Sequence, residues 1–345
     1  SLALSLFRVV LGALTIVFAA FTSLIQTRAR NLLAYDAVGQ VGYMVLGIGT
    51  LSPIGIAGAL FHMVNHALYK SCLFLGLGGI ERKRGTDNLD SLGGLARKMP
   101  LTLFTMLTAS LAASGIPPLN GFFSKWLVYQ GVIETFGLLS PLIPALCLIL
   151  ALFGSALTLA VFMKLIHSIF LAKEAEAKYV ELERASGFSI LFPQVVLATA
   201  CLSLGIFARP LLINPALARL LPLVGEAGIW QPQSATVLII TGMVLGAIIY
   251  GASRIRVRVT SEFIGGEEIA PEMRVSGAGF YLTIEQLPFF SQIYQLTKRR
   301  FFDIYEVLRT WMLFFARVMR LAHSGSLPLY LLWLLVGVVV LLLIK

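Results

Sequence analysis

Apolar runs long enough to cross a bilayer recur along almost the whole chain, and they constrain its fold more than any other feature. A scan for runs of about 20 residues predicts about eight spans. They are Val9–Gln26, Ala37–Leu51, Ile54–Gly79, the interrupted run Pro100–Glu134, Pro141–Ala172, Ser189–Ala208, Ala235–Tyr250 and Leu327–Ile344. Only 13% of the 345 residues are charged, whereas a soluble domain carries about a quarter. We therefore predict an all-α, polytopic membrane protein.

Basic residues gather in the loops on one side of these spans. That side holds Arg28, Arg30, Arg82, Lys83, Arg84, Arg97, Lys98, Lys173, Lys178, Arg184, Arg254, Arg256 and Arg258, and the opposite loops hold only Arg209 and Arg219. The positive-inside rule places the first set in the cytoplasm. It explains the net charge of +10 better than nucleic-acid binding does, so we expect a lipid bilayer and no nucleic acid as partner.

The chain carries no recognisable redox or cofactor motif. Its cysteines, Cys72, Cys147 and Cys201, all lie inside predicted spans, which favours packing over disulfides. It has no CxxC, no glycine-rich nucleotide fingerprint and no paired-histidine pattern typical of haem-binding spans. We expect no cofactor and no redox chemistry in this chain itself. Since it begins at Ser1 without a signal-peptide pattern, we also expect a fragment or one piece of a longer polypeptide.

The run Ile54–Gly79 carries His62, His66 and Lys70 at intervals of four residues. On a helix these positions drift by about 80° around the axis, so they share one face over roughly 12 Å. Ionisable groups at membrane depth are costly and by default indicate an ion or proton path. Structural polar contacts are one alternative. A metal site is disfavoured, because Cys72 is the nearby thiol and the run offers no carboxylate.

The run Pro100–Glu134 is interrupted near its centre. The interruption contains Gly115, Pro117, Pro118 and Gly121. Prolines remove backbone donors and glycines loosen the chain, so we predict a broken helix with Lys125 on its second half. Unwound backbone at membrane depth is tolerated where it is buried in protein or lines a wet cavity, and it recurs at the ion sites of transporters. The alternative is a loop between two short helices, with Lys125 at the interface.

Three more basic residues lie near span ends. Arg30 follows the first span, where it either lies at the cytoplasmic interface or gates the buried row. Lys164 and His167, three positions apart, share a helix face. They either extend to the interface or belong to the relay.

The chain changes character after Tyr250. Residues 251–326 are typical of a polar loop followed by a helix, Leu287 to Leu321, whose apolar and aromatic residues recur every three or four positions. Basic residues interrupt that helix too often for a span, so we expect it to lie laterally in the membrane interface or along neighbouring subunits. Residues 327–345 then form the last span.

Four sequence motifs occur in an order that resembles a known family. They are Gln26–Tyr35, Gln40–Met44, His62 with His66 and Lys70, and Gly115–Lys125. Together they resemble the core of the antiporter-like subunits of respiratory complex I, Mrp-type sodium/proton antiporters, membrane-bound hydrogenases and formate hydrogenlyases. The resemblance covers roughly residues 1–170, and the tail looks more weakly like the hydrogenase branch.

The resemblance implies that residues 1–172 form the second of two inverted five-helix repeats, followed by two further transmembrane helices in residues 173–250. The first repeat, with its glutamate–lysine pair, has no counterpart here and would be supplied elsewhere. Lys70 with His62 and His66 matches the central relay, and Lys125 matches the residue that passes protons to the periplasmic side. Arg30 occupies a position that can hold lysine. Because arginine stays charged, it would orient water rather than relay a proton.

We therefore expect a proton-translocating membrane subunit of a redox-driven complex, of the complex I or energy-converting hydrogenase type, in a prokaryotic inner membrane. Its partners would be other membrane subunits, contacted by the lateral helix, and a peripheral redox module. A charge change arriving laterally would make Lys70 release its proton towards Lys125. Sodium/proton exchange of the Mrp type is an alternative, slightly disfavoured because sodium prefers oxygen ligands and the buried charges identified here are on nitrogens. A structural scaffold without transport is the third.

Overall fold

The computed structural model describes residues 2–137, 141–172 and 188–207, together with short helical pieces after residue 236. The helices are α1 (Leu2–Leu24), α2 (Ala29–Gly49), α3 (Pro53–Arg84), α4 (Pro100–Ser114), α5 (Asn120–Glu134), α6 (Leu142–Ile166) and α7 (Phe188–Ile206). Short turns of other helix types join them: η1 (Leu89–Ser91), η2 (Thr135–Gly137) and η3 (His167–Leu171). The chain divides into two compact units, Ser1–Leu287 and Pro288–Lys345, and all these helices belong to the first. The predicted all-α class is confirmed for the described residues.

Local signals at both ends define α3, the helix that carries the predicted histidine–lysine row. Ser52 caps its N-terminus by accepting a hydrogen bond from the Gly55 N–H, and Pro53 supplies a φ suited to the first turn. At the other end Gly85 adopts φ 70°, and its N–H donates to the Glu81 carbonyl at 2.7 Å. The last turn is basic, which complements the helix dipole and carries α3 beyond the predicted end of the apolar run.

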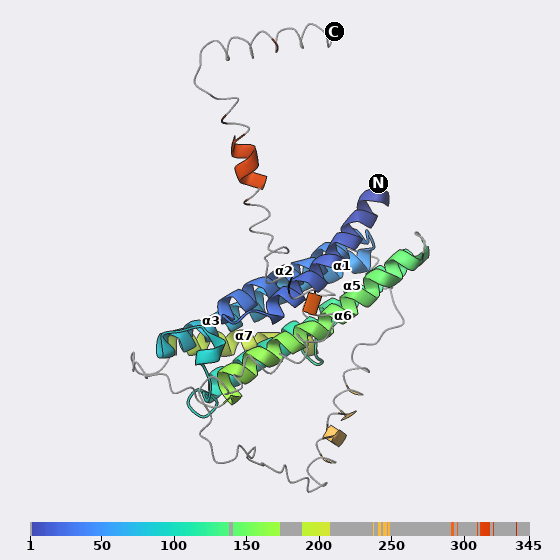
Figure 1. The fold of residues 1–345 in the computed structure, drawn as a ribbon. Coiled ribbons are helices and arrows are strands. Elements are labelled where there is room, and N and C mark those ends of the chain that lie inside the picture. Colours follow the sequence, from blue (N-terminus) through green and yellow to red (C-terminus); the bar gives the residue numbers. More distant parts are fainter. Residues whose placement is uncertain are drawn as a thin grey trace, which may run out of the picture. The chain divides into compact units, whose positions relative to one another are not determined.

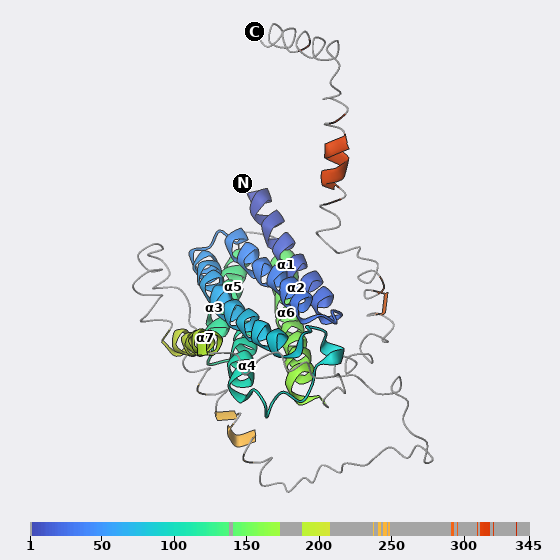
Figure 2. The ribbon, with the colours of Figure 1, turned by 90° about the vertical axis from the view of Figure 1, so that its left-hand side faces the viewer.

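The helices pack as a bundle in which α3 contacts α2, α4, α5 and α7. Helix α1 runs alongside α2 and α6 (Figure 1), and the turned view shows α3 beside α2 and α7 (Figure 2). Close approach of α1 and α2 requires glycine, since a Cβ on Gly12 would lie 2.6 Å from the Leu46 amide nitrogen. A fully buried apolar cluster that includes Val9, Ile16 and Tyr43 fills the space between α1, α2, α5 and α6.

Large apolar side chains also cover the outside of the bundle, among them Phe7, Phe104 and Ile149. Four of the described helical stretches are long and apolar enough to cross a membrane: Ala3–Leu24, Ala29–Gly49, Leu142–Leu171 and Phe188–Ile206. Helix α3 has 32 residues and reaches about 48 Å at about 1.5 Å per residue. The predicted spans Ala235–Tyr250 and Leu327–Ile344 lie, for the most part, outside the described residues.

The predicted helix break is present. Helix α4 ends at Ser114, Gly115 adopts a left-handed φ of 81°, and α5 begins at Asn120. A Cβ on Gly121 would lie 1.8 Å from the Ala112 carbonyl oxygen, so a glycine is needed where the two helices meet. The predicted interruption of the run Pro100–Glu134 is therefore confirmed as two helices of 15 residues each.

Two predicted helix starts differ most from the structure. Helix α1 begins at Leu2 rather than at Val9, and α2 begins at Ala29 rather than at Ala37. Polar residues early in α2, above all Asp36, lower the local hydropathy and hid its first two turns. The helix continues through them because Asp36 is paired inside the bundle.

The tail predictions fall largely outside the described residues. These are the polar loop in residues 251–326, most of the lateral helix from Leu287 to Leu321, and the last span in residues 327–345. Within the second unit, residues 311–317 are helical, and the Trp311 ring stacks on that of Phe315 at 6.2 Å between centroids.

Candidate functional site

Lys70 and Asp36 form a buried ion pair between α3 and α2. The ammonium nitrogen of Lys70 donates to Asp36 Oδ2 at 2.5 Å and to the Leu33 carbonyl at 2.9 Å. Lys70 is 6% exposed and Asp36 is 2% exposed. The expectation that the buried charges are all on nitrogens is wrong, because it overlooked Asp36 on the neighbouring helix. A carboxylate so placed compensates the lysine charge where water is scarce.

A row of hydrogen bonds leads from this pair across the bundle. Gln40 lies one turn after Asp36 on α2, and its Nε2 donates to Asp36 Oδ1 at 3.0 Å. Gln40 Oε1 lies 3.2 Å from His62 Nε2 and accepts from the Tyr69 hydroxyl at 3.4 Å. On the far side of the ring, His62 Nδ1 lies 2.9 Å from Ser124 Oγ on α5. The row therefore joins α2, α3 and the second half of the broken helix.

His66 lies on the predicted face of α3 but outside this row. Its ring meets Tyr69 edge-on, with 5.6 Å between centroids. Its buried Nε2 makes no hydrogen bond to any described residue. The structure thus connects Lys70 to His62 through Asp36 and Gln40 of α2 rather than through His66.

Lys125 forms a second buried centre on α5. It is 2% exposed, so its side chain lies inside the helix bundle rather than on the bundle surface. Its ammonium nitrogen donates to Ser155 Oγ on α6 at 3.1 Å and lies 4.5 Å from the centre of the Tyr43 ring. Ser155 in turn donates to the carbonyl of Ser114, the last residue of α4. The helix break thus helps to hold the lysine in place.

Tyr43 lies between the two centres. Its ring centroid is 5.6 Å from that of His62 and 4.5 Å from the Lys125 ammonium nitrogen. Its hydroxyl donates to the Ala151 carbonyl at 2.7 Å, which fixes the ring against α6. His62 and Lys125 are therefore separated by one aromatic ring.

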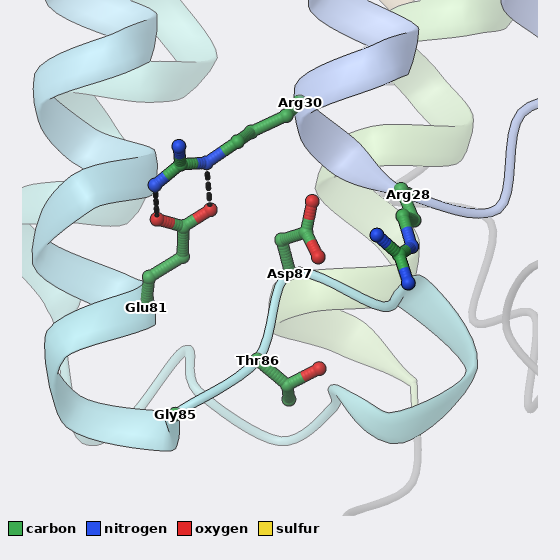
Figure 3. A pocket seen from close by; sticks show the side chains of 6 residues that line it. All are labelled: Arg28, Arg30, Glu81, Gly85, Thr86 and Asp87. Atoms are coloured by element: carbon green, nitrogen blue, oxygen red, sulfur yellow. Dashed lines mark hydrogen bonds and ion pairs between the residues drawn. The ribbon is translucent and has the colours of Figure 1, made fainter.

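Arg30 lies at the exposed end of the α2/α3 contact, where it forms a bidentate pair with Glu81 (Figure 3). The Arg30 side chain is 66% exposed and that of Glu81 16%. A surface cleft of about 380 Å³ surrounds the pair, and Asp87 lies between Arg30 and Arg28 in it. A second cleft of about 400 Å³ shares Arg30 and Glu81. It continues along both helices to Phe74, one turn from Lys70.

Lys164 is buried near the end of α6. Its ammonium nitrogen donates to the carbonyl of Leu24, the last residue of α1, at 2.7 Å. A cation at a helix C-terminus is favoured by the helix dipole. His167 begins η3 directly after α6. The two residues therefore lie on either side of the junction between α6 and η3.

Sequence reasoning missed the α2 half of the site, although a signal for it exists. Asp36, Gln40 and Tyr43 follow at intervals of four and three, so they occupy one helical face. In the described part of the chain, no group of three or more His, Cys, Asp or Glu side chains is arranged to hold a metal. The arrangement instead brings three groups that can bind and release protons, an ammonium, a carboxylate and an imidazole, into one buried row with the Gln40 amide and the Ser124 hydroxyl.

The chain is similar to membrane subunits of several ion-translocating complexes. Residues 1–158 match the family model described as NADH:quinone oxidoreductase/Mrp antiporter, TM. Formate hydrogenlyase subunit 3 of Escherichia coli is 30% identical over 84% of this chain and 50% of its own length. NADH-quinone oxidoreductase subunit N of Desulforudis audaxviator is 33% identical over 59% of this chain and 41% of its own length.

A solved structure extends the likeness beyond the family model. A chain of the membrane-bound sulfane sulfur reductase, an archaeal respiratory membrane complex, matches 98% of this chain and 56% of its own length. The TM-score is 0.69 and the identity 26%. This chain spans about half the length of the relatives it matches. Residues 1–158 thus match the family model shared by NADH:quinone oxidoreductases and Mrp antiporters, and the chain is a homologue of membrane subunits of complex I, Mrp antiporters and formate hydrogenlyase.

Proposed function

We propose that this chain is a proton-translocating, antiporter-like subunit of a redox-driven membrane complex of the complex I or energy-converting hydrogenase type. The observation that carries the proposal is the buried Lys70–Asp36 pair, linked by hydrogen bonds to His62 and separated by one ring from Lys125. Buried ionisable groups are costly in a membrane protein and are retained mainly where they move ions or protons.

Electrostatic coupling drives the proposed transfer. Two unit charges interact by about 1 kcal/mol at roughly 16 Å with an effective dielectric constant near 20. A charge arriving from a neighbouring subunit can therefore shift the balance between ammonium and amine at Lys70 without touching it. The released proton passes through His62 and water towards Lys125, whose neutral partners leave its own charge uncompensated.

The remaining predicted residues have supporting roles in this proposal. His66, whose Nε2 has no hydrogen-bond partner in the part of the chain that the structure describes, holds a water of the relay in this proposal. Arg30 and Glu81 form the gate at the outer end of the cleft that leads along α2 and α3 to Phe74. Lys164 and His167 extend the relay at the junction of α6 and η3.

The type of complex in this proposal is inferred from the relatives and not from the geometry of the site. Residues 1–172 act as the second five-helix repeat, with α4 and α5 crossing the bilayer together as one broken span. The tail contacts neighbouring membrane subunits, and a peripheral redox module supplies the driving charge. The complex lies in a prokaryotic inner membrane, with the basic loops in the cytoplasm.

Sodium/proton exchange is the second candidate, because the pair contributes oxygens as well as nitrogens. Asp36 Oδ2 and the Leu33 carbonyl converge on one point, now held by the Lys70 ammonium. Carboxylate and carbonyl oxygens are ligands that hard cations prefer. A sodium/proton antiporter protein from Alkalihalophilus pseudofirmus is 31% identical over 59% of this chain and 39% of its own length.

The test uses the full-length subunit in its native complex, purified and reconstituted in proteoliposomes with a pH-sensitive dye. We expect the electron donor of the complex to drive proton movement at the same rate in sodium-free and sodium-containing buffer. Proton movement that requires sodium would support the exchanger instead. Electron transfer without any proton movement through this subunit would leave the scaffold as the explanation and contradict the proposal.

A further inference from the structure

Gln40 and Ser124 lie on either side of the His62 ring, and neither can be a proton store. Gln40 does not ionise near neutral pH, and Ser124 is an alcohol with one hydroxyl proton. Both are buried, and both have hydrogen-bond partners on other helices. Their donor and acceptor capacities are fixed by chemistry, so the protons in this part of the row can be assigned.

Asp36 fixes the orientation of the Gln40 amide. An ionised carboxylate only accepts hydrogen bonds, so the Gln40 group that faces it at 3.0 Å is the NH2. The reverse orientation would set the amide oxygen against the carboxylate and lose that bond. Because the Asp36 carboxylate is paired with the Lys70 ammonium and takes the Gln40 NH2, the Gln40 carbonyl oxygen is directed at His62.

The Gln40 oxygen in turn fixes the proton on His62. An amide oxygen only accepts, so the His62 Nε2 that faces it at 3.2 Å carries a hydrogen. With the proton on Nδ1 instead, Nε2 and Oε1 would oppose each other as two acceptors, and the Tyr69 hydroxyl, 3.5 Å from Nε2, would have to turn from the amide oxygen to the ring. The neutral ring therefore has a free lone pair on Nδ1, directed at Ser124.

Ser124 has three acceptors within reach and one proton to donate. Its Oγ lies 2.9 Å from His62 Nδ1, 3.2 Å from the Gly121 carbonyl and 3.4 Å from the Asn120 carbonyl. When His62 is neutral, the hydroxyl donates to Nδ1. When His62 is an imidazolium, Nδ1–H becomes the donor, and the Ser124 proton turns to the carbonyls in the first turn of α5.

We propose that Gln40 and Ser124 are positioning residues: Gln40 holds neutral His62 as the Nε2–H tautomer, and Ser124 turns its hydroxyl between His62 and the α5 backbone as the ring gains or loses a proton. The inference rests on the proposed function, because it describes how the Lys70 and Lys125 centres sense each other. Ser124 precedes Lys125 directly in α5, so its reorientation changes the hydrogen bonding of the turn that carries the second lysine.

The proposal separates the path of the proton from the path of the signal. An amide cannot pass a proton and remain an amide. Gln40 therefore only orients its hydrogen-bond partners and carries no proton. When water delivers a proton to Nδ1, that nitrogen forms a new N–H bond and the Ser124 hydroxyl rotates. No bond of Ser124 breaks.

The first test is the tautomer of His62 in the intact complex, read from histidine nitrogen signals after ¹⁵N-histidine labelling of the full-length subunit. The signals of His62 are those absent from a His62→Gln variant. We expect one neutral form, protonated at Nε2 and bare at Nδ1, in the wild type. In Gln40→Met we expect the Nδ1–H tautomer to appear. A neutral ring protonated at Nδ1 in the wild type, or an unchanged spectrum in Gln40→Met, would overturn the proposal.

The second test is proton translocation by serine variants. Ser124→Ala removes the rotating hydroxyl, and we expect a loss of about tenfold, the equivalent of one hydrogen bond. Ser124→Thr keeps a hydroxyl and should restore most of the rate. Ser110→Ala is the matched control, because that serine is buried on α4 and its hydroxyl meets no partner among the described residues. Wild-type translocation in Ser124→Ala, or no recovery in Ser124→Thr, would contradict the inference.

The two claims fail in different ways. If a complex without the Lys70 and Asp36 charges still translocates protons, the proposed function is wrong, and the tautomer of His62 still decides the assignment of Gln40. If removing those charges stops translocation while Ser124→Ala leaves it unchanged, only the role of Ser124 is wrong.

Discussion

The two buried lysines differ in how their charge is balanced. Lys70 meets a carboxylate at 2.5 Å and a backbone carbonyl, so its charge is compensated in place. Lys125 meets a serine hydroxyl and the face of a tyrosine ring, both neutral. Both side chains are almost fully buried. The degree of burial therefore does not distinguish the two lysines. Their partners determine how the protonation of each responds to a nearby charge.

This difference suggests a division of labour. An ammonium paired with a carboxylate keeps its proton until the charge around the pair changes. This behaviour suits a residue that releases its proton only when a new charge arrives nearby. An uncompensated ammonium is held by dipoles and a ring, so it gains and loses a proton with little rearrangement. In the proposed mechanism Lys70 is the loaded site and Lys125 the site that passes the proton on.

The largest effect on stability is expected for Asp36→Asn. It leaves the Lys70 charge buried without its partner, and breaking one side of a buried pair costs about 3–5 kcal/mol. The thermal unfolding of the purified complex measures the loss. Lys70→Met in the same background should recover most of it, since both charges are then gone. Equal and additive losses from the two substitutions would show that the pair is not coupled.

A smaller effect is expected for Lys125→Met. The substitution removes one hydrogen bond to Ser155 and a cation–π contact worth up to about 2 kcal/mol, and it also removes the cost of burying the charge. We expect an unfolding free energy within about 2 kcal/mol of the wild type, together with lost proton translocation. A destabilisation as large as that of Asp36→Asn would mean that Lys125 has a buried counter-charge after all.

The smallest effect on stability is expected for Arg30→Ala. Its pair with Glu81 is largely exposed, and exposed pairs contribute little and are screened by salt. The melting temperature should change less than in either lysine-site variant, and the difference should shrink further in high salt. If the pair gates the cleft, translocation will change while the melting temperature stays close to that of the wild type. A large, salt-independent loss of stability would contradict this placement.

Much of the fold follows from local signals in the sequence. The prolines and glycines between Ser114 and Asn120 predict the helix break, and the structure has it at those residues. The spacing of His62, His66 and Lys70 predicts one face of one helix, but it cannot say which of the three meet. Only His62 and Lys70 enter the hydrogen-bonded row, because α2 supplies the residues between them.

Hydropathy failed at the α2 half of the candidate site. The predicted span began at Ala37, directly after Asp36, since a scan for apolar runs treats a buried ion pair as two polar residues. The Asp36 charge is balanced by a charge on another helix, Lys70 on α3. A hydropathy window along α2 alone cannot detect that pairing. Periodicity would have placed Asp36, Gln40 and Tyr43 on one face, but their partners on α3 and α5 appear only when the helices are packed.

The most direct test of the central claim is proton translocation by the double variant Asp36→Asn/Lys70→Met in the reconstituted native complex. Single substitutions strand a buried charge, whereas the double variant removes both charges and keeps the side chains close to their original size. We predict a complex that assembles, unfolds near the wild-type temperature and transfers electrons but translocates no protons through this subunit. Proton translocation at the wild-type rate in that variant would contradict the account.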